Sequence, residues 1–261
     1  MFPQKPDEKK TMEKPIDFDL IRNARFPEGA LGTQMIEGMN RSHARLTEWG
    51  FSHISEFGQT VLDVGCGGGA ALKKLAERFP NAQLFGCDVS PLAIQSAEEL
   101  NAENVSAGKM SFHCGGVSEL PFPNGFFDSV FSVESLYFWP DPEKDLAEIL
   151  RVLKPGGRFM TVLEMVGGSM SERHAEIARR LEMFCPAPEE LRELLTRSGF
   201  SVTALTHDTQ NGWLCGVGKK KSVKFARSAS RHHCSVHKKR AVPNLSETAP
   251  FFDFKRPHSA F

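Results

Sequence analysis

Short apolar runs alternate with amphipathic stretches through the middle of the chain. The runs are bounded by glycine, proline or polar residues, which is typical of buried strands. The predicted strands are residues 60–64, 84–87, 110–114, 127–133, 158–164, 201–205 and 213–217. Between the runs, apolar residues recur three and four positions apart, the spacing of one helix face. The predicted helices are residues 71–79, 91–100, 142–153, 174–183 and 189–197.

Several element boundaries have their own sequence signals. Ser90-Pro91 and Asp141-Pro142 each place a capping side chain before a proline, and this pair starts a helix. Residues 154–157, Lys-Pro-Gly-Gly, end the helix that follows, because proline cannot continue it. Asn211-Gly212 is a hairpin signal. The hairpin predicts at least one antiparallel strand at the edge of the sheet.

An amphipathic segment precedes the first strand. Apolar residues between positions 29 and 49 fit mostly one helical face, and we expect a division into two helices near Gly38 or Asn40. Residues 1–50 are expected to form a disordered lead-in and an N-terminal helical layer, residues 51–218 the main domain, and residues 219–261 a basic, disordered tail. The repeated strand–helix units predict a doubly wound, mostly parallel α/β sheet with helices on both faces.

The strongest chemical signal is the segment at 61–69, Val-Leu-Asp-Val-Gly-Cys-Gly-Gly-Gly. A strand ends there and a helix begins, and glycines let the backbone approach a ligand closely. In open α/β sheets the ligand lies beyond the carboxyl ends of the strands. Asp88 ends the second strand, where a carboxylate accepts hydrogen bonds from a ribose diol. The pattern therefore predicts a ligand that contains a ribose.

Two classes of cofactor fit this loop. Gly65, Gly67 and Ala70 match the dinucleotide fingerprint, so an NAD-dependent oxidoreductase is one hypothesis. Asp63, however, stands directly before the loop, where a carboxylate would repel a pyrophosphate and would suit a cationic ligand. This position, together with the segments that follow, favours a cationic cofactor over a dinucleotide.

Four later motifs follow the glycine-rich segment in order. They are Gly-Cys-Asp-Val-Ser at 86–90, Glu-Leu-Pro-Phe at 119–122, Phe-Asp-Ser-Val at 127–130 and Arg-Val-Leu-Lys-Pro-Gly-Gly at 151–157. With them, residues 51–219 resemble the class I S-adenosylmethionine-dependent methyltransferases, in particular the small-molecule branch called type 11. The resemblance implies a Rossmann-like, seven-stranded sheet with an antiparallel last strand, S-adenosylmethionine as cofactor, and an unidentified small molecule as methyl acceptor. A non-catalytic S-adenosylmethionine-binding protein is a further alternative.

The resemblance also implies which residues bind the cofactor. They are Asp63, Gly65, Cys66, Gly67, Gly69, Asp88, Val89, Gly116, Val117, Ser118, Ser132 and Val133. The residues of the glycine loop would line the methionine and ribose end, and Asp88 would hold the ribose hydroxyls. Ser118 would replace the acid that many relatives have beside the adenine. Cys66 suits the turn by its small size rather than as a nucleophile.

Methyl transfer from a sulfonium is an in-line displacement, so it mainly requires alignment of the reactants and exclusion of water. A hydroxyl or an acidic carbon as acceptor also needs a general base. His43, Glu134 and Tyr137 are the candidates. Tyr137 belongs to an aromatic run at 136–140, which would either border the substrate or pack into the core.

Composition and charge indicate the compartment and the classes of partner, but not the reaction. The 261 residues are 40% hydrophobic and 25% charged, as in ordinary globular proteins, and no apolar run is long enough to span a membrane. Six scattered cysteines favour reduced thiols in the cytoplasm. The net charge is zero, but from Lys219 onward eleven Lys or Arg residues face two acids, so any contact with nucleic acid is expected in the tail alone. Oligomeric state is not predictable from these features.

One group in the tail has the residue types of a zinc site. His232, His233, Cys234 and His237 lie close together in the sequence. Structural zinc sites need a compact scaffold, and few apolar residues surround this group. We therefore predict no metal site.

Overall fold

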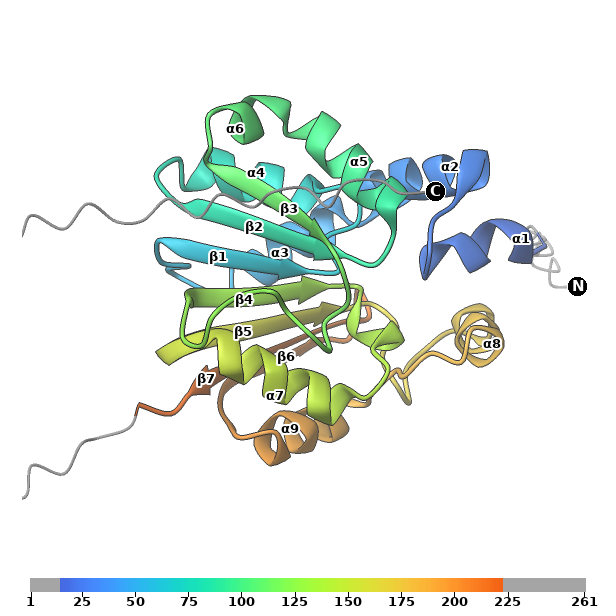
Figure 1. Cartoon of the computed structure of the whole chain (residues 1–261). Coiled ribbons are helices and arrows are strands. Elements are labelled where there is room, and N and C mark those ends of the chain that lie inside the picture. Colours follow the sequence, from blue (N-terminus) through green and yellow to red (C-terminus); the bar gives the residue numbers. More distant parts are fainter. Residues whose placement is uncertain (1–14, 223–261) are drawn as a thin grey trace, which may run out of the picture. The chain divides into compact units, whose positions relative to one another are not determined.

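The computed structural model describes residues 15–222. The expected lead-in at 1–14, most of the expected tail and the candidate zinc residues lie outside the described residues. A seven-stranded sheet in the order β3-β2-β1-β4-β5-β7-β6 forms the centre (Figure 1). The strands are β1 (Thr60–Val64), β2 (Gln83–Asp88), β3 (Met110–Cys114), β4 (Phe127–Val133), β5 (Leu153–Leu163), β6 (Phe200–Asp208) and β7 (Trp213–Lys220).

Helices cover both faces of this sheet. They are α1 (Phe18–Ile21), α2 (Gly29–Ser42), α3 (Ala44–Phe51), α4 (Ala70–Arg78), α5 (Pro91–Leu100), α6 (Ala102–Ser106), α7 (Pro142–Val152), α8 (Glu172–Arg180) and α9 (Pro188–Arg197), with short 3-10 turns η1 (Arg22–Ala24) and η2 (Leu136–Phe138). The side chains of α3, α4 and α5 share one apolar cluster with the sheet, and those of α7, α8 and α9 share another. The doubly wound α/β prediction is confirmed.

The parallel strands reverse their order at β1. From β1 the chain adds β2 and β3 on one side, then β4 and β5 on the other, and these pairs are all parallel. The loops after β1 and β4 therefore diverge to opposite faces and leave a crevice at the carboxyl ends of these strands. Buried, apolar β1 and β4 form the centre of the sheet, as expected for strands covered on both faces.

The last strand, β7, runs antiparallel to its neighbours as expected, but within the edge hairpin it is the inner strand and β6 is the outer one. β7 pairs antiparallel with both β5 and β6, and β6 is the outer strand. The burial of the two strands gives the physical reason. Residues 214–218 of β7 are all buried, which suits an interior position, whereas most of β6 is partly exposed, which suits an edge.

Helix starts follow the sequence signals closely. The Ser90 hydroxyl accepts a hydrogen bond from the Ala93 N–H at 3.1 Å, and the Asp141 carboxylate accepts one from the Lys144 N–H at 3.3 Å. The fifth strand, in contrast, begins at Leu153 and not at 158. Leu153 pairs with Phe127, and the register then shifts, so residues 154–157 form an irregularity within the strand rather than a loop before it.

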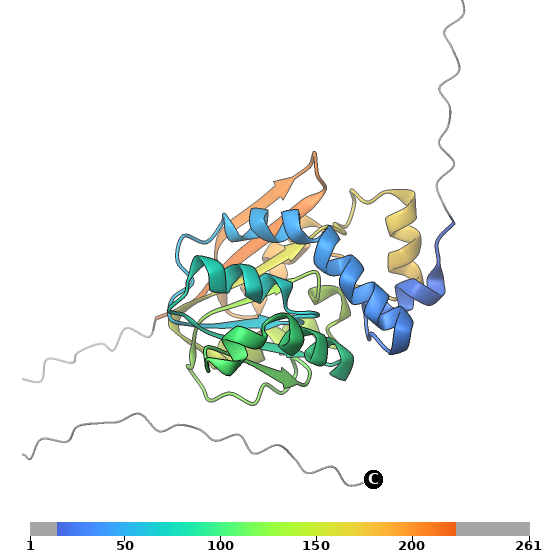
Figure 2. The ribbon, with the colours of Figure 1, turned by 90° about the horizontal axis from the view of Figure 1, so that it is seen from above.

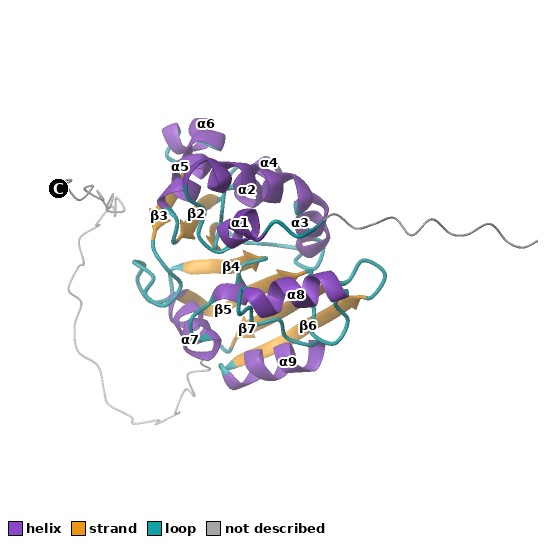
Figure 3. Cartoon of the chain, turned by 90° about the vertical axis from the view of Figure 1, so that its right-hand side faces the viewer, coloured by secondary structure: helices purple, strands orange, loops and turns teal. Residues whose placement is uncertain are grey.

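The N-terminal layer lies across the carboxyl ends of the strands. Its two main helices divide at His43 rather than at Gly38 or Asn40, because His43 leaves the helical conformation with φ −83° and ψ 0°. In the view toward these strand ends, α1, α2 and α8 lie on the viewer's side of the sheet (Figure 3). The Arg180 guanidinium of α8 lies 4.6 Å from the ring centre of Phe18 in α1, and Figure 2 shows the two helices side by side.

No helix in the range 15–222 is long and apolar enough to cross a membrane.

Candidate cofactor and acceptor site

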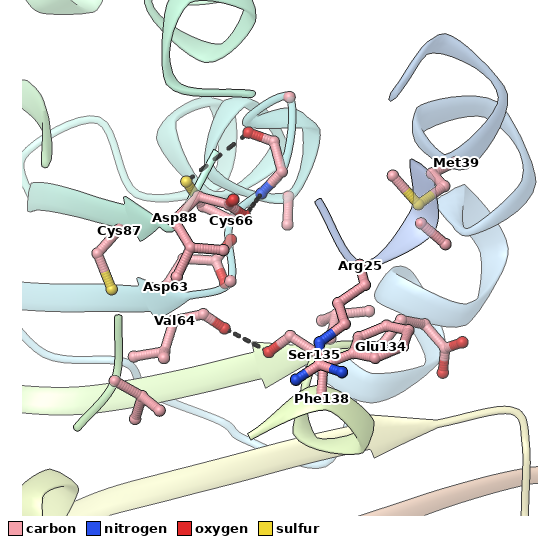
Figure 4. A pocket seen from close by; sticks show the side chains of 18 of the residues that line it. Arg25, Met39, Asp63, Val64, Cys66, Cys87, Asp88, Glu134, Ser135 and Phe138 are labelled. Carbon is pink, nitrogen blue, oxygen red and sulfur yellow. Dashed lines mark hydrogen bonds between the residues drawn. The ribbon is translucent and has the colours of Figure 1, made fainter. Parts of the chain in front are cut away.

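A cavity of about 400 Å³ opens at the switch point of the sheet. Its lining comes from the loops that follow β1, β2, β3 and β4, and from the N-terminal helices. The lining segments are residues 24–27, 63–68, 87–89, 115–118, 133–135 and 138–140, with Met39, Asn40, His43, Ala44, Thr47, Ala70, Ala71 and Lys74. Figure 4 shows Asp63 and Asp88 at one end and Glu134, Phe138 and Arg25 at the other.

The glycine loop begins with a close approach between two loops. The Gly65 N–H donates to the Cys87 carbonyl at 2.8 Å, with φ +75° at Gly65. A Cβ added at Gly65 would lie 2.3 Å from Cβ of Ser135, so no side chain fits there. Gly67 has φ +50°, and a Cβ built on it meets nothing within 4 Å. The open space before Gly67 is cavity that a ligand can fill.

Two carboxylates form the polar end of the cavity. Asp63 is 2% exposed, and its Oδ1 has no hydrogen-bond partner. Burial, and then the nearby charge of Asp88, raises the pKa of Asp63 well above its usual value. Asp88 accepts hydrogen bonds from the Gly67 N–H through Oδ2 and from the Ser90 N–H through Oδ1, both at 2.9 Å.

An unpartnered buried carboxylate is costly unless a donor or a positive charge reaches it. The ammonium and sulfonium of S-adenosylmethionine are such charges, and the ribose hydroxyls are donors for Asp88. A pyrophosphate would instead bring further negative charge toward Asp63 and Asp88. The residues present therefore fit the sulfonium cofactor and do not fit a dinucleotide.

The adenine side is mostly apolar. Val89 lines the cavity with 46% of its surface exposed, although it is a large apolar residue. Gly116 faces it, since a Cβ there would lie 3.5 Å from Cγ1 of Val89. Such a surface suits the face of a purine ring. The Ser118 hydroxyl, expected to bind the adenine amine, lines the cavity and donates to the buried Asp145 carboxylate at 2.7 Å, which leaves its oxygen able to accept a hydrogen bond from that amine.

Ten of the twelve expected cofactor residues line the cavity, and two do not. Gly69 caps α4 with φ +74° and packs against Asn101 and Ala97. Ser132 is fully buried, and its hydroxyl contacts the Ser135 hydroxyl at 2.7 Å. Cys66 lines the cavity, but burial raises the pKa of its thiol well above the usual value, so it stays protonated and is a poor nucleophile.

The opposite end of the cavity has a cluster of polar side chains from three elements. His43 lies at the junction of α2 and α3, Glu134 follows β4, and Glu164 follows β5. His43 Nε2 lies 3.8 Å from Glu164 Oε1. One side-chain nitrogen or oxygen atom from each of the three residues lies within 4.8 Å of the corresponding atoms of the other two. Burial lowers the pKa of His43, while the charge of Glu164 opposes that shift.

Glu134 is held in an uncommon backbone conformation by its contacts. Its φ is +60°, and its N–H donates to the Val162 carbonyl at 2.9 Å. Its Oε1 accepts hydrogen bonds from the Tyr137 hydroxyl at 2.7 Å and from the Glu164 N–H at 2.6 Å. Burial, and then the charge of Glu164, raises the pKa of Glu134 to about 8.

Tyr137 does not line the cofactor cavity, although it was a candidate base. It is 2% exposed, and its hydroxyl accepts a hydrogen bond from the Met165 N–H at 2.8 Å while donating to Glu134. Burial raises the pKa of this hydroxyl well above its usual value. The structure thus places Tyr137 behind Glu134 as its support.

Sequence reasoning missed two polar residues of the site. Glu164 ends the fifth predicted strand, so the rule that carboxyl ends of parallel strands meet at one edge could have placed it beside Glu134. Ser135 was not singled out, although its hydroxyl donates to the Val64 carbonyl at 2.7 Å and connects the loops after β4 and β1. Nothing in the local sequence signals that contact.

Comparison with known proteins gives a consistent result. A family model described as "Methyltransferase domain" matches residues 62–161. The chain is 34% identical over 180 residues to O-methyltransferase resE of Aspergillus sclerotiorum, a match that covers 67% of each protein. It is 31% identical over 157 residues to O-methyltransferase cnsE of Penicillium expansum, covering 59% of this chain and 56% of that protein.

Among solved structures, a similar one is geranyl diphosphate C-methyltransferase from Streptomyces coelicolor A3(2) in complex with Mg²⁺, geranyl diphosphate and S-adenosyl-L-homocysteine. The TM-score is 0.61 at 16% identity, and the match covers 74% of this chain and 85% of that one. At this identity the likeness is one of fold.

Proposed function

Because the chain belongs to the class I S-adenosylmethionine-dependent methyltransferases of type 11, we propose that it methylates a hydroxyl oxygen of a small molecule. The observation on which this rests is the cluster of His43, Glu134 and Glu164 at one end of the cofactor cavity. The curated relatives resE and cnsE are named as O-methyltransferases, which supports oxygen as the acceptor atom.

When bound, S-adenosylmethionine supplies a methyl group that is already activated by the sulfonium. We propose that Asp63 binds the positively charged methionine end and that Asp88 binds the ribose hydroxyls. Val89 and Gly116 would contact the purine. The backbone at Gly67 leaves room for the ligand, and the N-terminal helices line the cavity beside it.

The acceptor would lie between the cofactor and the polar cluster. A neutral hydroxyl is a weak nucleophile, so its proton must leave as the oxygen attacks the methyl carbon. His43 and Glu134 line the cavity, and Glu164 contacts both, so these side chains would promote loss of that proton. Tyr137 would act as a positioning residue that fixes the carboxylate of Glu134.

Transfer of labelled methyl groups tests this proposal. The full chain is incubated with methyl-labelled S-adenosylmethionine and a panel of phenols, aliphatic alcohols, amines and carboxylic acids, and labelled products are separated and identified. We expect label in methyl ethers, and a loss of at least about tenfold in turnover for His43→Asn with S-adenosylhomocysteine binding retained. Label confined to nitrogen or carbon products would contradict oxygen as the acceptor atom.

Two alternatives give different results in the same system. A non-catalytic binding protein would bind S-adenosylhomocysteine but label no product from any acceptor in a metabolite extract. An NAD-dependent oxidoreductase would bind NADH and not S-adenosylhomocysteine in calorimetry. Binding of S-adenosylhomocysteine with no binding of NADH is the result that we expect.

We further propose that the protein acts in the cytoplasm. The five cysteines within the described residues are free thiols, which supports a reducing compartment. A thiol titration of the protein isolated under native conditions without reductant should find free thiols, and disulfide-linked cysteines would contradict this assignment.

A further inference from the structure

The polar cluster has the composition of a metal site. It brings together one imidazole and two carboxylates, and it is the one group of three such side chains found to converge within residues 15–222. The side chains come from three separate segments, so they are positioned by the packing of α3 on β5 and by the pairing of β4 with β5. All three are half-buried, and His43 and Glu134 face the cavity.

The separations suit one shared ion. Metal–ligand bonds of about 2.0–2.2 Å place neighbouring ligand atoms about 3 Å apart and opposite ligand atoms about 4.3 Å apart in an octahedral shell. The 3.8 Å between His43 Nε2 and Glu164 Oε1 lies between these values. The third ligand atom, from Glu134, lies within 4.8 Å of both, so small side-chain adjustments would close the shell.

Glu134 is oriented in the way that a ligating carboxylate usually is. Its Oε1 is occupied by the Tyr137 hydroxyl and the Glu164 N–H, which leaves Oε2 for a ligand. Metal ligands commonly have such outer hydrogen bonds, which fix the direction of the carboxylate. The hydroxyl of Tyr137 is itself fixed by the Met165 N–H.

The charge balance also favours a cation. Within the described residues, no lysine or arginine forms an ion pair with Glu134 or Glu164, although Arg25 lines the same end of the cavity, and His43 is the basic side chain that pairs with Glu164. Two carboxyl groups therefore share one imidazole, and a divalent ion would balance the charge of their ionised forms.

We propose that His43, Glu134 and Glu164 bind one divalent cation of the Mg²⁺ or Mn²⁺ type, with the acceptor oxygen as a further ligand. Carboxylate oxygens suit these ions, and acceptors with a second adjacent oxygen, such as catechols or α-hydroxy carbonyl compounds, would chelate the ion. Binding of the ion does not depend on the proposed function, whereas the role of the acceptor does.

The ion would assist transfer as a Lewis acid. Coordination lowers the pKa of the acceptor hydroxyl, so the O–H bond breaks and the proton passes to solvent water. The oxygen lone pair then forms the O–C bond as the C–S bond breaks, and the electron pair of that bond goes to sulfur, which becomes a neutral thioether. The ion is neither oxidised nor reduced.

Binding of Mn²⁺ to the full chain tests the site without any acceptor. The electron paramagnetic resonance signal of free Mn²⁺ is followed as protein is added, in the presence of S-adenosylhomocysteine. We expect about one bound Mn²⁺ per chain, and Mg²⁺ should displace it. The variants Glu134→Gln and Glu164→Gln keep side-chain size and remove one ligand charge each, and we expect at least about tenfold weaker binding in each.

Two controls separate this site from others. Glu176→Gln removes a carboxylate on α8 that lies outside the cavity and pairs with Arg179 and Arg180, and it should leave Mn²⁺ binding unchanged. Replacement of His232, His233 and His237 together by alanine removes the other histidine-rich segment and should also change nothing.

Unaltered S-adenosylhomocysteine binding in the ligand variants would show that they are folded. Absence of Mn²⁺ and Mg²⁺ binding below millimolar concentration, or binding that survives both ligand variants, would overturn the proposal. Neither result would affect the assignment of S-adenosylmethionine as cofactor. That assignment fails only if S-adenosylhomocysteine does not bind to the parent chain.

Discussion

Gly67 offers a direct test of the proposed cofactor position. Its φ is +50°, and a Cβ added there meets no protein atom within 4 Å. Gly67→Ala should therefore fold without a clash, while its methyl group projects into space that the ligand needs. Gly65→Ala is a poor test by comparison, because its Cβ would overlap Ser135 at 2.3 Å and disturb the loop itself.

The expected magnitudes come from two separate effects. A left-handed backbone costs an alanine about 1–2 kcal/mol, so the free energy of unfolding should fall by about that amount. Displacement of the ligand from contact with the loop should weaken binding of S-adenosylhomocysteine at least about tenfold, which corresponds to 1.4 kcal/mol.

Gly108→Ala provides the matched control. Gly108 also has a positive φ, +68°, and open space around a built Cβ, but it precedes β3 and does not line the cavity. Thermal unfolding and calorimetric titration with S-adenosylhomocysteine are measured for both variants. We expect similar loss of stability in the two, and weaker binding in Gly67→Ala alone. Equal dissociation constants for the two variants would refute the placement of the cofactor at this loop.

Three further predictions concern binding, the core and pH. Asp88→Ala should weaken S-adenosylhomocysteine binding by about 1.5–3 kcal/mol, because it removes hydrogen bonds to a charged group, and an unchanged dissociation constant would remove Asp88 from the site. Phe131→Ala should lower the free energy of unfolding by about 3–5 kcal/mol, since this ring is fully buried; a loss below 1 kcal/mol in urea denaturation would contradict that packing. Desolvation opposes ionisation of Asp128, but hydrogen bonds from Lys154, Thr60 and Gln59 outweigh it and lower its pKa. Asp128→Asn should therefore cost about 1 kcal/mol at pH 7, a modest value for a partly exposed pair, and the difference from the parent should shrink as pH falls below about 4; a constant difference would argue against the ion pair.

Local signals predicted much of the fold. The limits of β1 and β4 agree with the apolar runs, because buried strands in a parallel sheet are apolar on both faces and end at polar or glycine residues. The limits of β3, a largely exposed edge strand, also agree with the prediction. The division of the N-terminal helices was misplaced because tertiary packing overrides local helix propensity there. Gly38 and Asn40 have low helix propensity, but α2 packs on α5 and on the glycine loop, and this packing keeps both residues helical.

The composition of the site was less accessible to sequence reasoning. The residues of the glycine loop and Asp88 were found because they follow strands in a fixed order. The hydrogen bond between Ser118 and Asp145, and the contact between His43 and Glu164, join segments far apart in the chain. No periodicity or spacing encodes such pairs, and they follow only from the crossing of helices over the strand ends.

The interior position of β7 has a consequence for synthesis of the protein on the ribosome. Strands β1 to β5 can assemble as they emerge, but the outer edge of β5 has no neighbour until residues 213–220 have been made. The nascent chain therefore exposes an unpaired apolar strand edge late in translation, which is a site for wrong pairing with other chains. Chains that stop before residue 213 would lack the strand that joins β5 to β6, and we expect them to aggregate rather than to fold into a smaller domain.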